Sequence, residues 1–183
     1  MDKPVSVGMS ILDFSKLTMY EFYYDHLQAK YGYENLKVIY GDTDSLIYLV
    51  FTEDYYKDMM KNKNIYDLTA WKNEYHNDEN NNVLGKFKDE CANDILNEAV
   101  AIRSKLYTYS TEKMKIGKRA KGIKKNVTEN ELMFNDFKNC LFNDVTKNIT
   151  QNFIRSENQK ISTYSQNKVA LSSFSDKRYL VDN

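Results

Sequence analysis

Residues Leu36–Leu49 read LKVIYGDTDSLIYL, in which two apolar runs flank the four residues GDTD. Leu36–Tyr40 and Ser45–Phe51 are rich in β-branched and aromatic residues, and they predict two antiparallel strands joined by a short turn. Asp42 and Asp44 occupy that turn. Aspartate is an ordinary turn residue and also a metal ligand, so the pair indicates either a polar surface turn or a metal site.

The metal interpretation has a simple physical basis. Alternate side chains of an extended chain point to the same face, so Asp42 and Asp44 are expected to converge on one point. Magnesium takes oxygen ligands, usually one or two carboxylates completed by water and substrate phosphates. A carboxylate pair of this kind suits phosphoryl transfer, in which metal ions activate an attacking hydroxyl and stabilise the leaving oxygen.

The segment before the hairpin predicts a long helix over residues 7–31, ending at Gly32. Its apolar residues recur at spacings of mostly three and four, which indicates one apolar side. They are Val7, Ile11, Leu12, Leu17, Tyr20, Tyr24, Leu27 and Tyr31.

The segments after the hairpin predict a mixture of helices and strands, so the expected fold class is α+β. A short helix is expected from Asp54 to about Lys61, followed by a polar surface insertion, Asn62–Asn82, with Trp71 as its main apolar anchor. Residues 91–102 can form a helix that turns into a strand, and residues 131–142 form a helix by their spacing. Two or three short strands are expected after it.

Bulk composition narrows the class of protein. The 183 residues are 42% apolar, which is enough for a core, and 26 basic side chains balance 26 acidic ones. No apolar run reaches the roughly 18 residues that span a bilayer, so no membrane partner is expected. Two isolated cysteines and two isolated histidines predict neither a disulfide framework nor a zinc site. An intracellular, reducing compartment is therefore expected.

The balanced total hides a strongly basic segment between Arg103 and Lys125. It has nine basic residues and one acidic residue, Glu112, which makes it net +8 in a chain of net charge zero. Clustered cations neutralise phosphates and release counterions, an attraction that is independent of nucleic-acid sequence. A solvated lysine-rich loop is the alternative, but the neighbouring Tyr107 and Tyr109 favour contact with nucleic acid.

The six residues Tyr40–Ser45, YGDTDS, resemble the third sequence motif of family B DNA polymerases, whose palm hairpin carries Tyr-x-Asp-Thr-Asp-Ser. In that family the second aspartate is a principal metal ligand and the first supports the site. The resemblance implies these roles for Asp44 and Asp42 and implies Mg²⁺ as the cofactor. The residues that it implies to shape the turn are Tyr40, Gly41, Thr43 and Ser45.

Other segments resemble the protein-primed branch of that family, which includes polymerases of Maverick/Polinton-type transposons and related viruses. Residues 7–27 are similar to the segment before the motif, and residues 118–134 and 168–182 are similar to the end of such polymerases. The run RSKLY is similar to a Lys-x-Tyr motif implicated in holding the primer end, a role that then falls on Lys105 and Tyr107. The residues expected to grip DNA phosphates are Lys118, Arg119, Lys121, Lys124 and Lys125.

The resemblance implies DNA-directed DNA polymerase activity, in which a nucleotide is transferred to a DNA primer. Residues 1–125 would form the C-terminal half of a palm, an antiparallel sheet with packed helices, and residues 126–183 a small thumb subdomain. The implied partners are primer–template DNA, deoxynucleoside triphosphates, the N-terminal part of the polymerase and a terminal protein primer. The nucleus or a viral replication site is the implied location.

Several motifs of the family have no counterpart in the chain. One is the Asp-Ser-Leu-Tyr-Pro type motif that supplies another metal carboxylate, and another is the Lys and Asn-Ser-x-Tyr-Gly helix that holds the incoming triphosphate. We therefore expect the chain to be inactive alone, and a non-catalytic DNA-binding remnant of a mobile element is the alternative. A haloacid-dehalogenase-like phosphatase also places Asp-x-Asp after a strand, but here the chain continues through Leu46 as a second strand.

Overall fold

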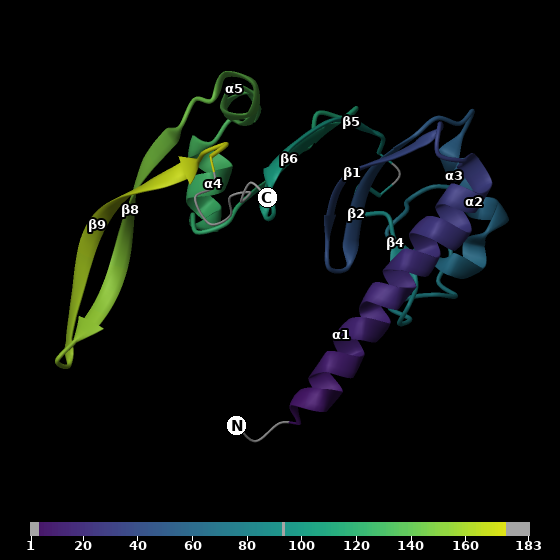
Figure 1. Cartoon of the computed structure of the whole chain (residues 1–183), viewed down its shortest axis with the longest axis horizontal. Helices are drawn as coiled ribbons and strands as arrows, with labels where there is room; N and C mark the ends of the chain where they lie inside the picture. Colours follow the sequence, from purple (N-terminus) through teal and green to yellow (C-terminus); the bar gives the residue numbers. More distant parts are fainter. Residues whose placement is uncertain (1–3, 93, 175–183) are drawn as a thin grey trace, which may run out of the picture. The chain divides into compact units, whose positions relative to one another are not determined.

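The computed structural model describes residues 4–92 and 94–174. Its helices and small, mostly antiparallel sheets confirm the α+β class (Figure 1). The chain divides into two compact units, Met1–Ile95 and Leu96–Asn183. The boundary expected at residues 125 and 126 lies within the second unit, and the assignment of a palm and a thumb stays a prediction.

A long helix opens the first unit and confirms the helix expected over residues 7–31. It consists of α1 (Val5–Tyr20), the π-helical segment η1 (Glu21–Gln28) and α2 (Ala29–Tyr31). Gly32 ends it with a φ of 75°, and its N–H donates to the Gln28 carbonyl at 2.9 Å. Glycine is favoured there because it has no Cβ to clash at positive φ.

The expectation of a single apolar side is wrong for α1. No residue of α1 is buried, whereas Phe22 and Leu27 in η1 are buried in the core of the first unit. At 100° per residue, the exposed Phe14 points opposite to the exposed Val5. The helix is therefore anchored through its second half, and apolar residues surround its first half.

The predicted hairpin is confirmed. Strand β1 (Leu36–Asp42) pairs antiparallel with β2 (Ser45–Val50), and Asp42 pairs directly with Ser45, so the loop is two residues long. Leu36, Leu46, Tyr48 and Val50 pack in the same core as the buried residues of η1. This packing fixes the hairpin against the long helix.

The remainder of the first unit is a compact region built around Trp71. It contains α3 (Tyr55–Lys61), the 3-10 turn η2 (Lys63–Ile65) and the parallel pair β3 (Tyr66–Asp67) and β4 (Phe87–Lys88). Trp71 is 1% exposed, which confirms it as an anchor. Tyr66 and Leu68 are buried with it, so the segment expected as a surface insertion contributes to the core.

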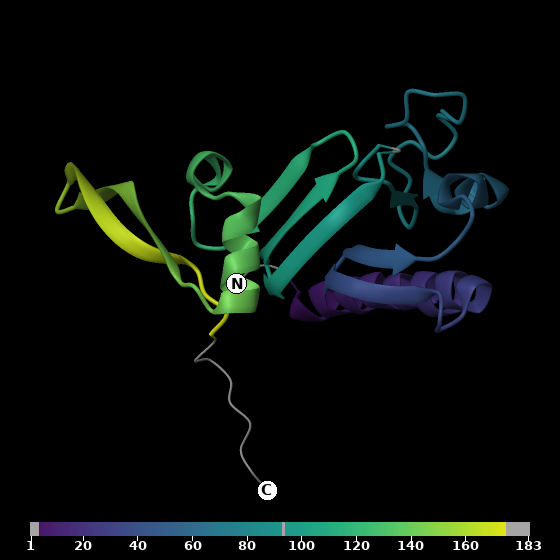
Figure 2. The ribbon, with the colours of Figure 1, turned by 90° about the horizontal axis from the view of Figure 1, so that it is seen from above.

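The second unit begins with a three-stranded antiparallel sheet in the order β5 (Leu96–Arg103), β6 (Leu106–Thr111), β7 (Ile116–Ala120). Figure 2 shows helices α4 (Lys125–Glu131) and α5 (Phe134–Asn143) beside this sheet. Phe137 and Cys140 of α5 share a buried core with Val100 and Leu106 of the sheet. The helix predicted over residues 131–142 is confirmed, whereas residues 96–102 are entirely strand.

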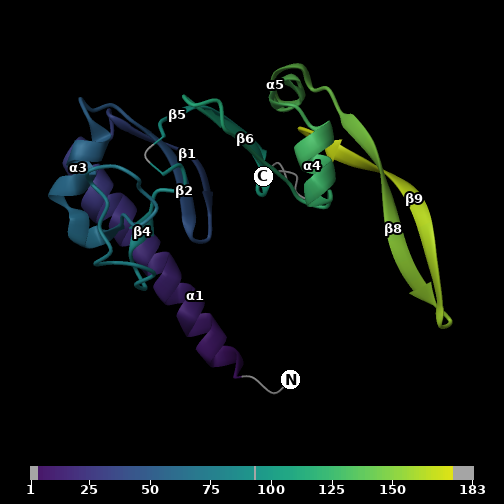
Figure 3. The same ribbon diagram turned by 180° about the vertical axis from the view of Figure 1, so that it is seen from behind.

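A long two-stranded ribbon completes the second unit. Strands β8 (Lys147–Glu157) and β9 (Lys160–Leu171) pair antiparallel along their whole length, and the ribbon extends away from α4 and α5 (Figure 3). Two strands of 11 and 12 residues thus replace the two or three short strands expected from the sequence.

Candidate functional site

The two aspartates of the GDTD turn lie at the tip of the β1–β2 hairpin. Asp42 is the last residue of β1 and is half-buried, whereas Asp44 is the second loop residue and is exposed. The loop is closed by the Asp44 N–H, which donates to the Asp42 carbonyl at 2.6 Å, and by the Ser45 hydroxyl, which donates to the same carbonyl at 3.2 Å. Both carboxylates are thus held on a short, hydrogen-bonded loop.

A β-bulge at Ile39 decides which way Asp42 faces. The pairing of β1 with β2 shifts at this residue, and an extra residue reverses the faces of the side chains that follow it. Leu46 and Tyr48 of β2 pack against the core, so Ser45, which precedes them, lies on the other face. Asp42 is the cross-strand partner of Ser45, and it therefore faces away from the core of the unit.

Thr43 has a φ of 53°, in the left-handed region. A β-branched residue is an outlier there, and such strain costs on the order of 1–3 kcal/mol where it persists. The Thr43 hydroxyl donates to Asp42 Oδ1 at 3.1 Å. The expected reason for convergence of the two aspartates is therefore wrong, because the chain is not extended between them. That Asp42 and Asp44 share a cation stays a prediction, and it depends on the conformation of the turn.

The other residues implied to shape the turn have identifiable roles in packing. Tyr40 is 8% exposed. A Cβ added at Gly41 would lie 3.2 Å from Leu46 Cδ2, so glycine lets the Leu46 side chain pack closely over the opposite strand. Among the described residues, no group of three or more His, Cys, Asp or Glu side chains lies together as a metal site. Asp42 and Asp44 are thus the metal-ligand candidates that the hairpin itself offers.

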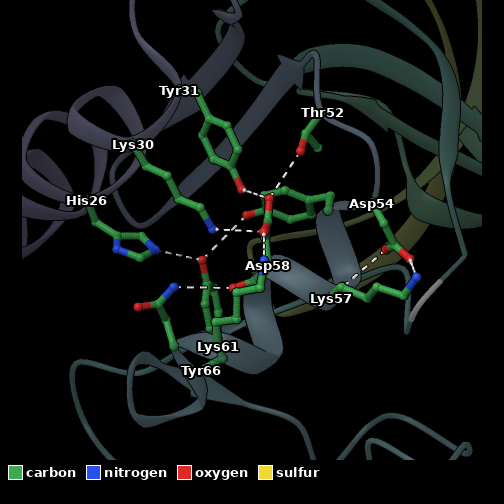
Figure 4. Close-up of polar contacts among 11 residues, drawn as sticks. His26, Lys30, Tyr31, Thr52, Asp54, Lys57, Asp58, Lys61 and Tyr66 are labelled. Atoms are coloured by element: carbon green, nitrogen blue, oxygen red, sulfur yellow. Dashed lines mark hydrogen bonds and ion pairs between the residues drawn. The ribbon is translucent and has the colours of Figure 1, made fainter.

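A hydrogen-bonded network behind the hairpin, which the sequence did not predict, centres on Asp58 of α3 (Figure 4). Asp58 Oδ2 accepts from the Tyr31 hydroxyl at 3.0 Å and from the Thr52 hydroxyl at 3.1 Å. Asp58 Oδ1 lies 3.1 Å from Lys61 Nζ and 3.3 Å from Lys30 Nζ. These contacts join the end of the long helix, the exit from β2 and α3.

Tyrosine hydroxyls extend this network to β2. The hydroxyls of Tyr48 and Tyr55 share a short hydrogen bond. The Tyr55 hydroxyl also lies 3.5 Å from the Tyr66 hydroxyl. The Tyr66 hydroxyl in turn lies 3.1 Å from His26 Nε2. The side chain of Tyr48 comes from β2, so the chain of contacts fixes the hairpin to α3 and to η1. Its charged groups, Asp58, Lys30 and Lys61, are paired with one another. The network is therefore suited to holding the hairpin in position.

The network shifts the ionisation of its members. Burial alone would raise the pKa of Asp58, but hydrogen bonds from Lys61, Tyr31 and other donors outweigh it and lower that pKa to about 2. Burial, followed by the charge of Lys30, lowers the pKa of His26. Burial raises the pKa of Tyr55 and of Tyr66 well above the usual range. At neutral pH, Asp58 is therefore an anion and His26 is neutral.

The basic segment is divided between the two faces of the β5–β6–β7 sheet. Tyr107 pairs with Arg119, whereas the next pair, Thr108 with Lys118, lies on the opposite face. Thr108 is fully buried on the face that carries the core, so Lys118 lies on the helix side of the sheet. Tyr107 and Arg119 are therefore together on the other face, as a nucleic-acid site requires, but Lys118 is not with them.

Lys118 has a structural task that the sequence did not predict. Its ammonium donates to the carbonyls of Glu129 and Leu132, at 2.6 and 2.8 Å, at the C-terminal end of α4. Lys147 Nζ donates to the neighbouring carbonyl of Glu131 at 3.1 Å. The last carbonyls of a helix lack partners within it and favour positive charge. Lys118 thus caps α4.

The other predicted phosphate-binding residues differ in what holds them. Lys124 donates to the Asn152 carbonyl, and its ammonium lies 4.9 Å from the centroid of the Phe153 ring. Lys125 forms an exposed i,i+4 ion pair with Glu129 at 3.8 Å. Arg119 and Lys121 are exposed. Lys105 is exposed at the turn between β5 and β6, with a φ of 60°.

One face of the β8–β9 ribbon carries cations and aromatic rings. Phe153 and Tyr164 pair across the strands and stack, with centroids 5.5 Å apart at 25°. Lys168 Nζ lies 4.9 Å from the Phe153 centroid. Arg155 and Lys160 are further cations on the same face, nearer the ribbon tip, where Glu157 pairs across the strands with Lys160 and lies 3.6 Å from Arg155 Nε. A two-stranded ribbon fits the major groove of DNA, and aromatic rings with nearby cations also suit stacking with bases.

The opposite face of the ribbon is uncharged and is formed by Thr150, Asn152, Ile154, Ser156, Ile161, Thr163, Ser165 and Asn167. The sequence predicted short strands in this part of the chain, including Lys160–Leu171, but it gives no information on strand length. The isolated cations of the segment were missed because they are not clustered along the chain. They come together only after the two strands pair.

No protein-family model, curated protein or solved structure matches this chain. Within residues 4–92 and 94–174, none of the helices has the length and apolar character required to cross a membrane.

Proposed function

We propose that this chain is the metal-binding and duplex-binding part of a DNA-directed DNA polymerase of family B. In this proposal the first unit carries palm elements, and Asp44 and Asp42 hold Mg²⁺ at the primer 3′-hydroxyl and the α-phosphate of the incoming nucleotide. The reaction is nucleotidyl transfer with release of pyrophosphate. A carboxylate on another polypeptide segment completes the two-metal site.

The observation that carries the proposal is the hairpin tip. Two carboxylates lie at the tip of a hairpin with apolar strands, Asp42 at the end of β1 and Asp44 in the two-residue loop, and a bulge turns Asp42 away from the core. Thr43 adopts an unfavourable conformation within the same loop. Strained residues persist at functional sites when the surrounding structure determines their conformation. A two-residue turn can adopt the left-handed conformation without this strain by using Gly or Asn, so the threonine is the unusual feature of this loop.

The duplex-binding part of the proposal depends on the second unit. Tyr107 and Arg119 on the face of the sheet opposite the helices, with Lys105 at the adjacent turn, would hold the primer strand. Lys121 and Lys125 would contact phosphates. The cationic face of the β8–β9 ribbon extends this surface as a thumb-like element. The antiparallel hairpin also argues against a phosphatase of the haloacid-dehalogenase type, because β2 follows Asp44 directly.

Binding and extension measured on the same purified chain test the proposal. Fluorescence anisotropy with a labelled primer–template should show binding that weakens steeply with salt, because phosphate contacts release counterions. Primer extension with Mg²⁺ and nucleotides should be absent. Extension by the chain alone would show that no further carboxylate is needed, and a lack of salt-sensitive binding would refute the polymerase proposal.

A non-catalytic DNA-binding protein is the second candidate, because the cationic surfaces of the second unit do not depend on the aspartates. The two candidate functions differ in whether Asp42 and Asp44 bind a metal ion. In a polymerase fragment, Mn²⁺ used as a probe should bind at Asp42 and Asp44 when primer–template is present. In a non-catalytic DNA-binding protein, Mn²⁺ should not bind at these two residues.

A further inference from the structure

Apolar side chains are exposed all round α1, and those on one side continue along the helix into η1. Val5, Met9 and Leu12 are 67, 62 and 44% exposed, and Tyr20 and Tyr24 are 59 and 52% exposed. Figures 1 and 3 both show the N-terminal half of α1 extending beyond β1, β2 and α3 of its own unit. We propose that a second copy of the chain covers this side, with the two α1 helices packed antiparallel.

The five side chains form a stripe that Lys16 interrupts between Leu12 and Tyr20. Val5, Met9 and Leu12 are separated by four and three residues, the spacing that places side chains on one side of a helix. Tyr20 and Tyr24 continue the same side, with ring centroids 6.1 Å apart. The stripe is therefore aliphatic at its N-terminal end and aromatic at its C-terminal end.

The charges of α1 match an antiparallel pair. Its charged residues are Asp13 and Lys16, whose carboxylate and ammonium lie 3.5 Å apart. If Asp13 of one copy faces Lys16 of the other, symmetry creates the same pair twice. The same register places Met9 against Tyr20 and Val5 against Tyr24 of the second copy. Methionine sulfur and aromatic rings attract each other, so the two ends of the stripe are complementary.

A membrane surface and nucleic acid fit this surface less well. A helix that lies on a membrane surface has a polar face rich in Lys and Arg, whereas Asp13 balances the one lysine of α1. Nucleic acid requires cations in the contact surface. The half-exposed stripe presents on the order of 500 Å² per copy, or about 1,000 Å² in a dimer, the lower limit of specific interfaces. We therefore expect association at micromolar concentrations.

Sedimentation velocity of the full chain over a concentration series tests the proposal. We expect a reversible monomer–dimer equilibrium, weakened at least tenfold by Leu12→Asp. Phe14→Asp is the matched control, because Phe14 is 69% exposed on another side of α1. A chain that stays monomeric, that binds vesicles of anionic lipid through α1, or that responds equally to both substitutions would overturn the proposal. Circular dichroism checks that each variant keeps its helix content.

Charge reversal and cross-linking test the orientation. Asp13→Lys and Lys16→Asp should each weaken the homodimer, and a mixture of the two variants should form a heterodimer. A mixture of Met9→Cys and Tyr20→Cys chains should give an intermolecular disulfide with an added oxidant, faster than either variant alone. Faster cross-linking of Met9→Cys with itself would indicate parallel helices and contradict the proposal. The outcome is independent of polymerase activity.

Discussion

The loops of the β1–β2 and β8–β9 hairpins have the same length but differ in how well their residues suit the turn conformation. Each has a two-residue loop, Thr43–Asp44 in the first and Asn158–Gln159 in the second. Asn158 and Gln159 have φ values of 49° and 63°, the left-handed pair of a turn in which Asn is favoured at the first position. The first loop places a threonine in that conformation instead. The ribbon turn follows local preference, and the GDTD turn does not.

The two hairpins also differ in how they are held. Tyr48 of β2 is hydrogen-bonded into the network that leads to Tyr66 and His26, and Leu46 packs in the core. Most of the ribbon is exposed, and Ile154 and Ile161 are 75 and 78% exposed near its tip. An isolated two-stranded ribbon is marginally stable. The short hairpin is therefore suited to fixed carboxylates, and the ribbon to an extended contact surface.

The largest expected effect removes the anchor of the short hairpin. Asp58→Asn leaves Lys30 and Lys61 without their carboxylate and weakens the hydrogen bonds from Tyr31 and Thr52. Hydrogen bonds to charged groups contribute about 1.5–3 kcal/mol each, so we expect a loss of about 2 kcal/mol in the free energy of unfolding of the first unit. Hydrogen exchange should accelerate in β1 and β2 but not in β8 and β9. Equal acceleration of exchange in both hairpins would contradict the difference in how the two hairpins are held.

Acid should weaken the same anchor in two steps. The lowered pKa of His26 means that protonation favours the unfolded chain, so stability falls as the pH drops below about 6.5. The pKa of Asp58 falls from 3.8 to about 2, so its contribution is complete above pH of about 4 and is lost as the pH falls toward 2. Urea titrations between pH 7 and pH 2 measure both steps. In Asp58→Asn, the lower step should disappear.

DNA affinity should divide the cations of the second unit into two groups. Replacing Arg119, Lys121 and Lys125 by Gln should weaken primer–template binding by at least tenfold and reduce the salt dependence, because each neutralised phosphate contact contributes to the slope. Lys118→Met should destabilise α4 with little change in affinity per folded molecule. A comparable loss of affinity for Lys118→Met, with the fold intact, would return that residue to the contact surface.

The smallest effect comes from exchanging turn residues. Thr43→Asn should stabilise the first unit by up to about 1 kcal/mol, because asparagine tolerates the left-handed conformation. Asn158→Thr should lower the protection of ribbon amides from hydrogen exchange. A destabilising Thr43→Asn would show that the hydroxyl contact to Asp42 outweighs the backbone strain.

Local patterns in the sequence predicted the long helix and the helix of residues 131–142 from apolar spacings of three and four, and the hairpin from β-branched and aromatic runs on both sides of a turn. The bulge at Ile39 had no sequence signal, since an extra residue in a strand depends on the pairing with β2. Lys118 was grouped with Arg119 because they are adjacent in sequence, whereas alternation in β7 places them on opposite faces. Asp58 was missed because its partners Tyr31, Thr52 and Lys30 are brought together only by tertiary packing.

The proposed function requires the GDTD turn to bind a divalent cation. Paramagnetic broadening by Mn²⁺ in nitrogen–proton NMR spectra of the full chain, with primer–template present, tests it most directly. We expect broadening centred on the amides of residues 41–46, competed by Mg²⁺ and abolished in the double variant Asp42→Asn, Asp44→Asn. Broadening that is absent from these amides, or that persists in the double variant, would contradict the assignment of a metal site to the hairpin.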